Sequence, residues 1–126
     1  MPFSLLAQSK RLPRNYTNHF TSDSIVIDGK IDDKAWQSVP WSDNFVDIAT
    51  AAKAPDNLFT HFKMLWNKQY LYIAACLGEP AIWGKLTERD AIIYKDNDFE
   101  VFIDPDGDGL NYYELEINAL GTIMDL

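Results

Sequence analysis

Acidic side chains at alternate positions give the clearest chemical signal in the sequence. Asp104, Asp106 and Asp108 are separated by one residue each, and a glycine follows them. Oxygen ligands at every second position suit Ca²⁺, which accepts about six to eight oxygens in flexible geometry. Residues 96–98 would add ligands if the two loops converge. The twelfth position of an EF-hand loop would be Leu115, which cannot ligate, and Asp and Gly also form plain solvated turns. A calcium site and a metal-free turn therefore both remain open.

Glutamates on predicted strands form a second group. Glu100, Glu114 and Glu116 occupy outward-facing positions of two predicted strands. They would form a polar patch if those strands are neighbours. Paired carboxylates also carry out glycoside hydrolysis. Ordinary solvent-exposed glutamate is the commoner alternative, and the sequence reveals neither a pocket nor a raised pKa that would favour catalysis.

Aromatic rings are the third group. The chain has 4 Trp, 6 Tyr and 7 Phe, a content that favours a β-rich core or an aromatic binding face. A flat ring stacks on the apolar C–H face of a pyranose while nearby polar groups bind its hydroxyls. Apolar neighbours place Trp36 and Trp66 in the predicted core. The rings that are candidates for exposure are Tyr94, Trp83, Tyr112 and Trp41, with packing in the core as the open alternative for the first two.

The charge balance argues against several classes of partner. The formal net charge is −8, and 11 basic residues are scattered among 19 acidic ones. Binding to nucleic acid requires clustered Lys and Arg, and so does attraction to an anionic membrane surface. No apolar run approaches the roughly 18 residues of a membrane span. A neutral sugar or a divalent cation fits this charge better.

Other catalytic patterns are missing from the sequence. Cys76, the single cysteine, lies in an apolar run and is predicted to be a small buried hydrophobe. His19 and His61 have no matched partner at ligand spacing. Neither a Ser-His-Asp pattern nor a Gly-rich phosphate loop is present.

Alternating hydrophobicity predicts an all-β protein. In the last two predicted strands the apolar side chains are expected to face the core, and the glutamates are expected to face solvent. Residues 81–98 are predicted to be a long irregular connection with a helical turn near residues 83–86. Strands are predicted at residues 25–27, 59–66, 70–77, 99–104 and 112–119, with a short helix at 33–37 and a further apolar segment at 122–126.

The first residues of the chain are predicted to lie outside the folded domain. Residues 1–24 are an N-terminal arm, either disordered or the remnant of a signal peptide with Ala7 at the cleavage site. Residues 25–126 are the N-terminal part of an antiparallel β-sandwich of the jelly-roll or immunoglobulin-like type. About five strands are fewer than the seven usual in a stable sandwich. We therefore expect the sandwich to be incomplete, and to be completed by a further C-terminal part or by a second chain.

Three blocks of sequence occur in a defined order. They are Ile-Asp-Gly-Lys-Ile-Asp (27–32) with Ala-Trp (35–36), Met-Leu-Trp (64–66) before Tyr-Leu-Tyr-Ile-Ala (70–74), and Asp-Asn-Asp-Phe-Glu-Val-Phe-Ile-Asp (96–104) with Tyr-Tyr-Glu (112–114). In order and spacing they resemble family 9 carbohydrate-binding modules, and above all the family-9-like domains of bacterial secreted proteins. The resemblance covers residues 25–126.

The resemblance implies a β-sandwich that occurs alone or attached to glycoside hydrolases. It implies that two aromatic rings clamp a sugar while calcium supports the fold. One clamp ring falls at Tyr94, where sugar-binding members carry Trp, and a sugar-contacting carboxylate falls at Glu100. A hydroxyl-binding Arg of those members falls at Glu116, so that contact is not reproduced. The second clamp ring would lie beyond Leu126.

The leading hypothesis is non-catalytic carbohydrate binding that supports polysaccharide breakdown by an associated glycoside hydrolase, in an extracellular or periplasmic location. The expected partner is an oligo- or polysaccharide, with no nucleic acid and no membrane span. The predicted sugar-binding residues are Tyr94, Glu100, Trp83 and Tyr112, and the predicted Ca²⁺ ligands are Asp104, Asp106 and Asp108.

Three alternatives stay open. A heme-binding or redox sandwich would need axial ligands, and its candidates Met64 and His61 are predicted on opposite faces of one strand. A glycosidase would use Glu100 and Glu116. A structural domain would bind no ligand.

Overall fold

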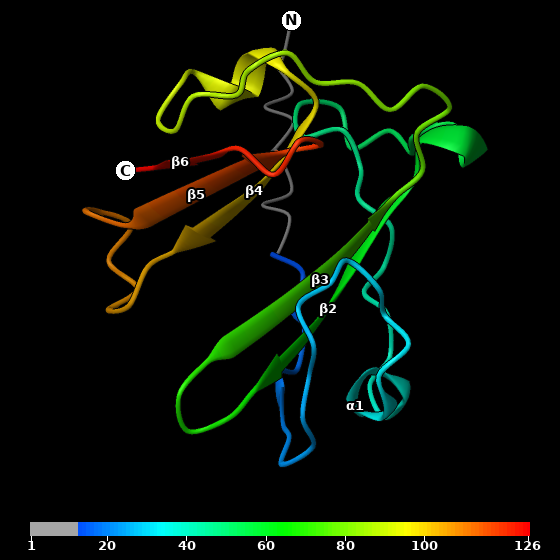
Figure 1. The fold of residues 1–126 in the computed structure, drawn as a ribbon, viewed down its shortest axis with the longest axis vertical. Coiled ribbons are helices and arrows are strands. Elements are labelled where there is room, and N and C mark those ends of the chain that lie inside the picture. Colours follow the sequence, from blue (N-terminus) through cyan, green and yellow to red (C-terminus); the bar gives the residue numbers. More distant parts are fainter. Residues whose placement is uncertain (1–12) are drawn as a thin grey trace, which may run out of the picture. The chain divides into compact units, whose positions relative to one another are not determined.

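The computed structural model describes residues 13–126, and within them the chain is built mainly of strands and irregular connections (Figure 1). The strands form two three-stranded sheets, ordered β1-β2-β3 and β4-β5-β6. Helical residues within the described part are limited to α1 (Lys34–Gln37) and two 3₁₀ turns, η1 (Asp56–Leu58) and η2 (Ile93–Lys95). The predicted all-β sandwich class is therefore confirmed.

Two further points concern the limits of the described chain. The predicted cleavage site at Ala7 lies outside the described residues. Among residues 13–126, no helix has both the length and the apolar character needed to cross a membrane.

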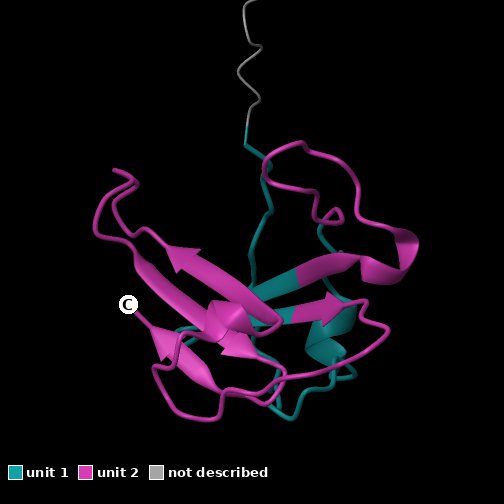
Figure 2. Cartoon of the chain, turned by 90° about the horizontal axis from the view of Figure 1, so that it is seen from above, with its two compact units in different colours: residues 1–42, 63–74 teal, residues 43–62, 75–126 magenta. Residues whose placement is uncertain are grey.

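The chain divides into two compact units (Figure 2). Unit 1 contains the residues up to 42 and residues 63–74, whereas unit 2 contains residues 43–62 and 75–126. The strands β2 (Thr60–Trp66) and β3 (Leu71–Leu77) run through both units. These two strands correspond to the predicted strands at 59–66 and 70–77.

Unit 1 packs around a small apolar core. The helix α1 lies where a helix was predicted at residues 33–37, and its Trp36 is buried as expected. The strand β1 (His19–Phe20) pairs in parallel with the end of β2. This short strand lies within the segment predicted to be an arm, and its parallel pairing departs from a purely antiparallel arrangement. The buried core residues are Ala35, Trp36, Val39 and Leu65.

Two expectations for unit 1 are wrong. Residues 25–27 form no strand, and the Ile27 side chain is 82% exposed. Trp66, which was predicted to be in the core, is 43% exposed and contacts the Phe20 ring edge to face, with 5.1 Å between the ring centroids. Trp66 is the last residue of β2, where the two-residue strand β1 gives it little cover.

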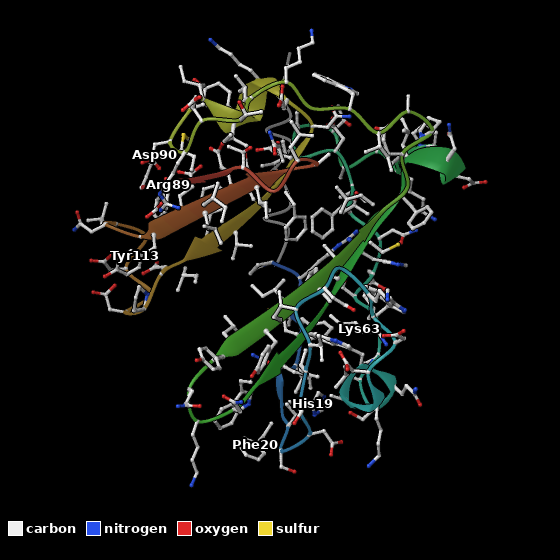
Figure 3. All side chains as sticks on the ribbon, viewed as in Figure 1. His19, Phe20, Lys63, Arg89, Asp90 and Tyr113 are labelled. Carbon is white, nitrogen blue, oxygen red and sulfur yellow. The ribbon has the colours of Figure 1, made fainter. Side chains whose placement is uncertain are left out.

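Lys63 is a charged side chain that unit 1 buries (Figure 3). Its Nζ donates a hydrogen bond of 2.6 Å to the backbone oxygen of Trp36 and lies 4.8 Å from the centroid of the Trp41 ring. The amine therefore covers one of the aromatic rings that the sequence offered as a sugar platform.

The sheet of unit 2 is antiparallel. β4 (Asp98–Ile103) pairs with β5 (Tyr113–Asn118), and β5 pairs with β6 (Ile123–Asp125). The predicted strands at 99–104 and 112–119 are confirmed to within a residue at each end. β6 lies within the predicted apolar segment at 122–126, and its Asp125 pairs with Arg89, which also contacts Asp90 (Figure 3).

One face of this sheet carries the acidic and amide side chains and the other is apolar, and the polar face is covered at Glu116 and Asn118. Glu116 and Asn118 are buried, whereas Leu115 and Ile117 are about two-fifths exposed. The prediction that Glu116 faces solvent is therefore wrong. The reason is that the connection before β4 lies against the polar face: η2 contacts β5, and Asn118 Nδ2 donates to the Leu86 backbone oxygen. That connection is irregular as predicted, but its helical turn is η2 rather than residues 83–86.

Candidate functional site

The strand register places four polar side chains together on the buried face of the β4-β5-β6 sheet. Glu100 lies opposite Glu116, and Asp98 lies opposite Asn118. Directly opposed residues of an antiparallel pair project from the same face, and so do alternate residues of one strand. Like charges directly opposite each other are destabilising. The Glu100–Glu116 pair therefore costs free energy that other groups must offset.

Asp96 fixes the preceding connection onto this face. Its Oδ2 accepts hydrogen bonds from the backbone N–H groups of Lys85 and Leu86, at 2.8 and 2.9 Å, and from Asn118 Nδ2 at 2.9 Å. The Leu86 N–H is the largest cause that holds the pKa of Asp96 below its ordinary value. Asp96 is therefore an ionised anchor between the connection and β5.

Three carboxylates meet beside this anchor. Asp98, Glu100 and Glu116 form what we call the strand cluster, in which one carboxylate oxygen from each residue lies within 4.8 Å of the others. The Glu116 side chain is only 1% exposed. The backbone of Tyr94 lies beside its carboxylate and acts to lower its pKa. Its Oε2, however, has no hydrogen-bond partner within the described part of the chain, and neither does Oδ2 of Asp98.

Burial and repulsion by neighbouring carboxylates raise the pKa values of all three carboxyls in the strand cluster, the neighbour of Asp98 being Asp96. Loss of hydration is the largest cause for each of them. Repulsion adds to it, from Asp98 on both glutamates and from Glu100 on Glu116. Such a site favours either bound protons or a bound cation.

The predicted calcium ligands form a second group, the loop cluster of Asp104, Asp106 and Asp108. The structure brings them together, with carboxylate oxygens within 4.8 Å of one another. Asp104 accepts hydrogen bonds from the backbone N–H groups of Gly107 and Gly109, at 3.0 and 2.9 Å. The Gly109 N–H is the largest cause that lowers the pKa of Asp104. The loop is thus closed by its own backbone, and calcium binding there stays a prediction.

The predicted sugar-binding rings lie at separate places in unit 2. Tyr94 is 59% exposed, and its backbone contacts the strand cluster through Glu116. Trp83 is exposed, and Lys85 Nζ lies 5.6 Å from its ring centroid. Tyr112 is exposed and contacts Phe102, with 5.6 Å between ring centroids. Among the residues that the structure describes, no ring contact joins Tyr94, Trp83 and Tyr112 to one another.

Two features of the site were missed by the sequence interpretation. Asp98 was assigned to the surroundings of the calcium loop, but it lies in the strand cluster with Glu100 and Glu116. Asp96 and Asn118 were not recognised as anchors. A signal was present, because Asp-x-Glu in one strand and Glu-x-Asn in the next become direct neighbours in the observed register. That register is a property of the pair of strands, and one strand does not reveal it.

Comparison with known proteins identifies one matching family and two enzymes with similar sequence. Residues 27–122 match the family described as carbohydrate family 9 binding domain-like. The chain is 33% identical over 89 residues to the exoglucanase XynX of Acetivibrio thermocellus. It is also 33% identical over 90 residues to the endo-1,4-beta-xylanase A of Thermoanaerobacterium saccharolyticum.

The matches cover most of this chain but little of each relative. Each covers 71% of this chain but only 7% of the relative. The chain therefore corresponds to a small part of either relative. No solved structure matches the chain.

Proposed function

Because the chain belongs to the carbohydrate family 9 binding domain-like family, we propose that it binds oligo- or polysaccharide without catalysing a reaction. It would support polysaccharide breakdown by an associated glycoside hydrolase. The names of the two relatives, an exoglucanase and a xylanase, support glucan and xylan chains as the substrate class. Because the two relatives are named for glucan and xylan polymers, the proposed location is extracellular or periplasmic.

The observation that carries this proposal is the position of Tyr94. Its side chain is 59% exposed, while its backbone lies beside the carboxylate of Glu116, opposite Glu100. An exposed ring stacks on the apolar face of a sugar. The exposed Glu100 carboxylate accepts hydrogen bonds from the hydroxyls at the rim. Trp83 and Tyr112 would add further contacts along a longer chain.

Burial favours binding over hydrolysis at this site. A glycosidase requires both of its carboxyl groups to reach the glycosidic bond. Glu116 is buried beneath the connection that carries Tyr94, so it is not accessible to a sugar. Neither the family nor the two relatives favour the heme-binding alternative or a structural domain without a ligand.

Two parts of the sequence-based hypothesis remain predictions. Calcium at Asp104, Asp106 and Asp108 is supported by the spacing of their oxygens. Completion of the sandwich by a further segment or a second chain is supported by the exposed apolar residues of β5, Leu115 and Ile117.

Isothermal titration with xylo- and cello-oligosaccharides tests the proposal. We expect Tyr94→Ala to weaken binding about tenfold, because the stacking surface is lost. The matched control is Tyr70→Ala, since Tyr70 is also 59% exposed but lies in the turn between β2 and β3. The proposal is wrong if no oligosaccharide binds, or if the two variants lose the same affinity.

A further inference from the structure

The connection between β3 and β4 carries two of the exposed rings, and it carries them on different segments. Trp83 lies in the segment of residues 81–86, whereas Tyr94 lies in η2, near the end of the connection. Both side chains are exposed. Neither segment is part of a sheet, so strand pairing does not fix the place of one ring relative to the other. Other contacts must therefore set that relation.

One carboxylate joins the two segments. Asp96 follows η2 directly, and its Oδ2 accepts hydrogen bonds from the backbone N–H groups of Lys85 and Leu86, at 2.8 and 2.9 Å. The same oxygen accepts a hydrogen bond of 2.9 Å from Nδ2 of Asn118, which lies in β5. Asp96 therefore ties the two segments to each other, and ties both of them to the sheet.

Two further hydrogen bonds fix the segment that carries Trp83. The backbone oxygen of Leu86 accepts one from Asn118 Nδ2, at 2.9 Å, and one from Thr122 Oγ1, at 2.8 Å. Both polar groups of the Leu86 backbone are thus paired, its N–H with Asp96 and its oxygen with these side chains. The backbone that follows the Trp83 ring is held in place before any ligand is bound.

The Tyr94 ring projects from a turn that is anchored on both sides. Its neighbour Ile93 is buried, and so is Asp96 two residues later. The backbone N–H of Asp96 donates a hydrogen bond of 2.8 Å to the backbone oxygen of Ile93, which closes the turn. Groups that are held in the binding geometry in advance lose less conformational entropy when a ligand binds.

We propose that Asp96 is a positioning residue for sugar binding, which sets the place of the Trp83 ring relative to the Tyr94 ring so that one oligosaccharide contacts both. Asp96 itself does not contact the sugar, because its side chain is buried and its Oδ2 already accepts three hydrogen bonds. The inference rests on the proposed function. It adds that the preferred ligand is an oligosaccharide that extends from one ring to the other, rather than a short sugar.

Isothermal titration of the full chain with xylo- and cello-oligosaccharides of increasing length tests the inference. For the wild type we expect the affinity to rise about tenfold from the disaccharide to the hexasaccharide, because the longer chain stacks on a second ring. Trp83→Ala should remove that rise. Asp96→Ala should also remove it although both rings are retained, because the segment with Trp83 is no longer tied to η2. The matched control is Glu88→Ala, an exposed carboxylate of the same connection, which should keep the rise.

A conservative variant separates positioning from a general loss of stability. The side-chain oxygen of Asn accepts hydrogen bonds as a carboxylate oxygen does, so Asp96→Asn should restore the rise to within about threefold of the wild type. If Asp96→Ala fails to fold, as judged by circular dichroism, Asp96→Glu decides. It keeps the carboxylate but lengthens the tie by one methylene group, so it should lose the rise.

Three results would overturn the inference: a wild-type affinity that does not rise with chain length, a full rise in folded Asp96→Ala or Asp96→Glu, or a loss of the rise in Asp96→Asn or Glu88→Ala. These results differ from failure of the proposed function. In that case no oligosaccharide binds, or Tyr94→Ala and Tyr70→Ala lose the same affinity. If the inference alone fails, binding still depends on Tyr94.

Discussion

The strand cluster and the loop cluster contain three carboxylates each, but their oxygen atoms have different surroundings. In the loop cluster, backbone N–H groups from the same short segment donate to every carboxylate. In the strand cluster, the carboxylates come from two strands, Glu116 is buried, and one of its oxygens has no partner within the described residues. Burial, with repulsion added to it, raises the pKa values in the strand cluster, whereas hydrogen bonds lower the pKa of Asp104 in the loop cluster.

The difference lies in the supply of hydrogen-bond donors. A turn leaves backbone N–H groups free, and the side chains of nearby Asp residues accept from them. A strand uses its backbone N–H groups in the ladder with its neighbours, so they are not available to carboxylates on the sheet face. Acidic residues in a turn therefore accept hydrogen bonds from the backbone of the turn, whereas acidic residues on a covered sheet face need donors from another part of the chain.

Removal of the Asn118 side chain should give the largest effect. Asn118 is 5% exposed; its Nδ2 donates to Leu86 and Asp96, and its Oδ1 accepts from two backbone N–H groups at 3.0 Å. Asn118→Ala leaves these buried groups without partners and should lower the free energy of unfolding by about 3–4 kcal/mol. Urea denaturation measures the change.

The loop cluster offers the control for this comparison. Asp108→Ala removes the acceptor for the backbone N–H of Leu110, which is exposed and can turn to water instead. We expect little change in the free energy of unfolding. Equal losses in the Asn118 and Asp108 variants would contradict the contrast between a covered sheet face and a solvated loop.

The next largest difference between the two clusters should lie in how each changes the stability of the protein with pH. In the strand cluster the pKa values are raised above 3.8 for Asp98 and 4.5 for the glutamates. The folded state then binds more protons than the unfolded state at pH values between the unfolded-state pKa of each carboxyl and its raised folded-state pKa. Stability of the metal-stripped protein should therefore rise as the pH falls from neutrality through the folded-state pKa values.

The loop cluster and the anchor should act in the opposite direction. The pKa values of Asp104 and Asp96 are lowered below 3.8, so the stability they contribute is lost as the pH falls below that value. Thermal melting of the metal-stripped protein across the acid range should show a maximum in mildly acidic solution. Glu116→Gln should flatten the rise towards that maximum. A melting temperature that falls steadily from neutral pH would rule out the repulsion argued for the strand cluster.

Local sequence patterns predicted the elements of unit 2 but not their orientation. The alternation of apolar and polar residues in β5 correctly identified the side chains that share a face. It did not reveal which face is covered, because the cover is a connection far along the chain. Asp96 and Asn118, which hold that cover in place, are 22 residues apart. No short-range period links two such residues.

The candidate site, like the strands of unit 2, was predictable from the sequence only in part. The grouping of the loop cluster was predicted because its three aspartates alternate within one short segment, and the structure brings their oxygens together, whereas calcium binding there stays a prediction. The exposure of Tyr94 also agrees with the sequence interpretation, although its contact with sugar stays a prediction. The strand cluster was not found, because it depends on the β4–β5 register and on burial by the connection.

Substitutions at two glycines should give smaller effects than Asn118→Ala, one in the connection that covers the sheet and one in the loop. A Cβ at Gly84 would lie 2.9 Å from Leu120 Cγ, so Gly84→Ala should cost about 1–2 kcal/mol as the connection shifts away from the sheet. Gly107 lies in the loop with a φ of +73° and open space around it, so Gly107→Ala should cost about 1 kcal/mol through backbone strain.

Because the two variants should lose similar free energies of unfolding, they are better distinguished by which backbone hydrogen bonds each one weakens. Amide hydrogen exchange at Lys85 and Leu86 reports whether their hydrogen bonds to Asp96 persist. Gly84→Ala should accelerate exchange at both amides, since the added methyl group displaces the segment that carries them. Gly107→Ala should leave them protected, because the loop closes through its own backbone. Acceleration in both variants would mean that the loop and the covered sheet face open as one cooperative element, and the two clusters could then not be treated as independent.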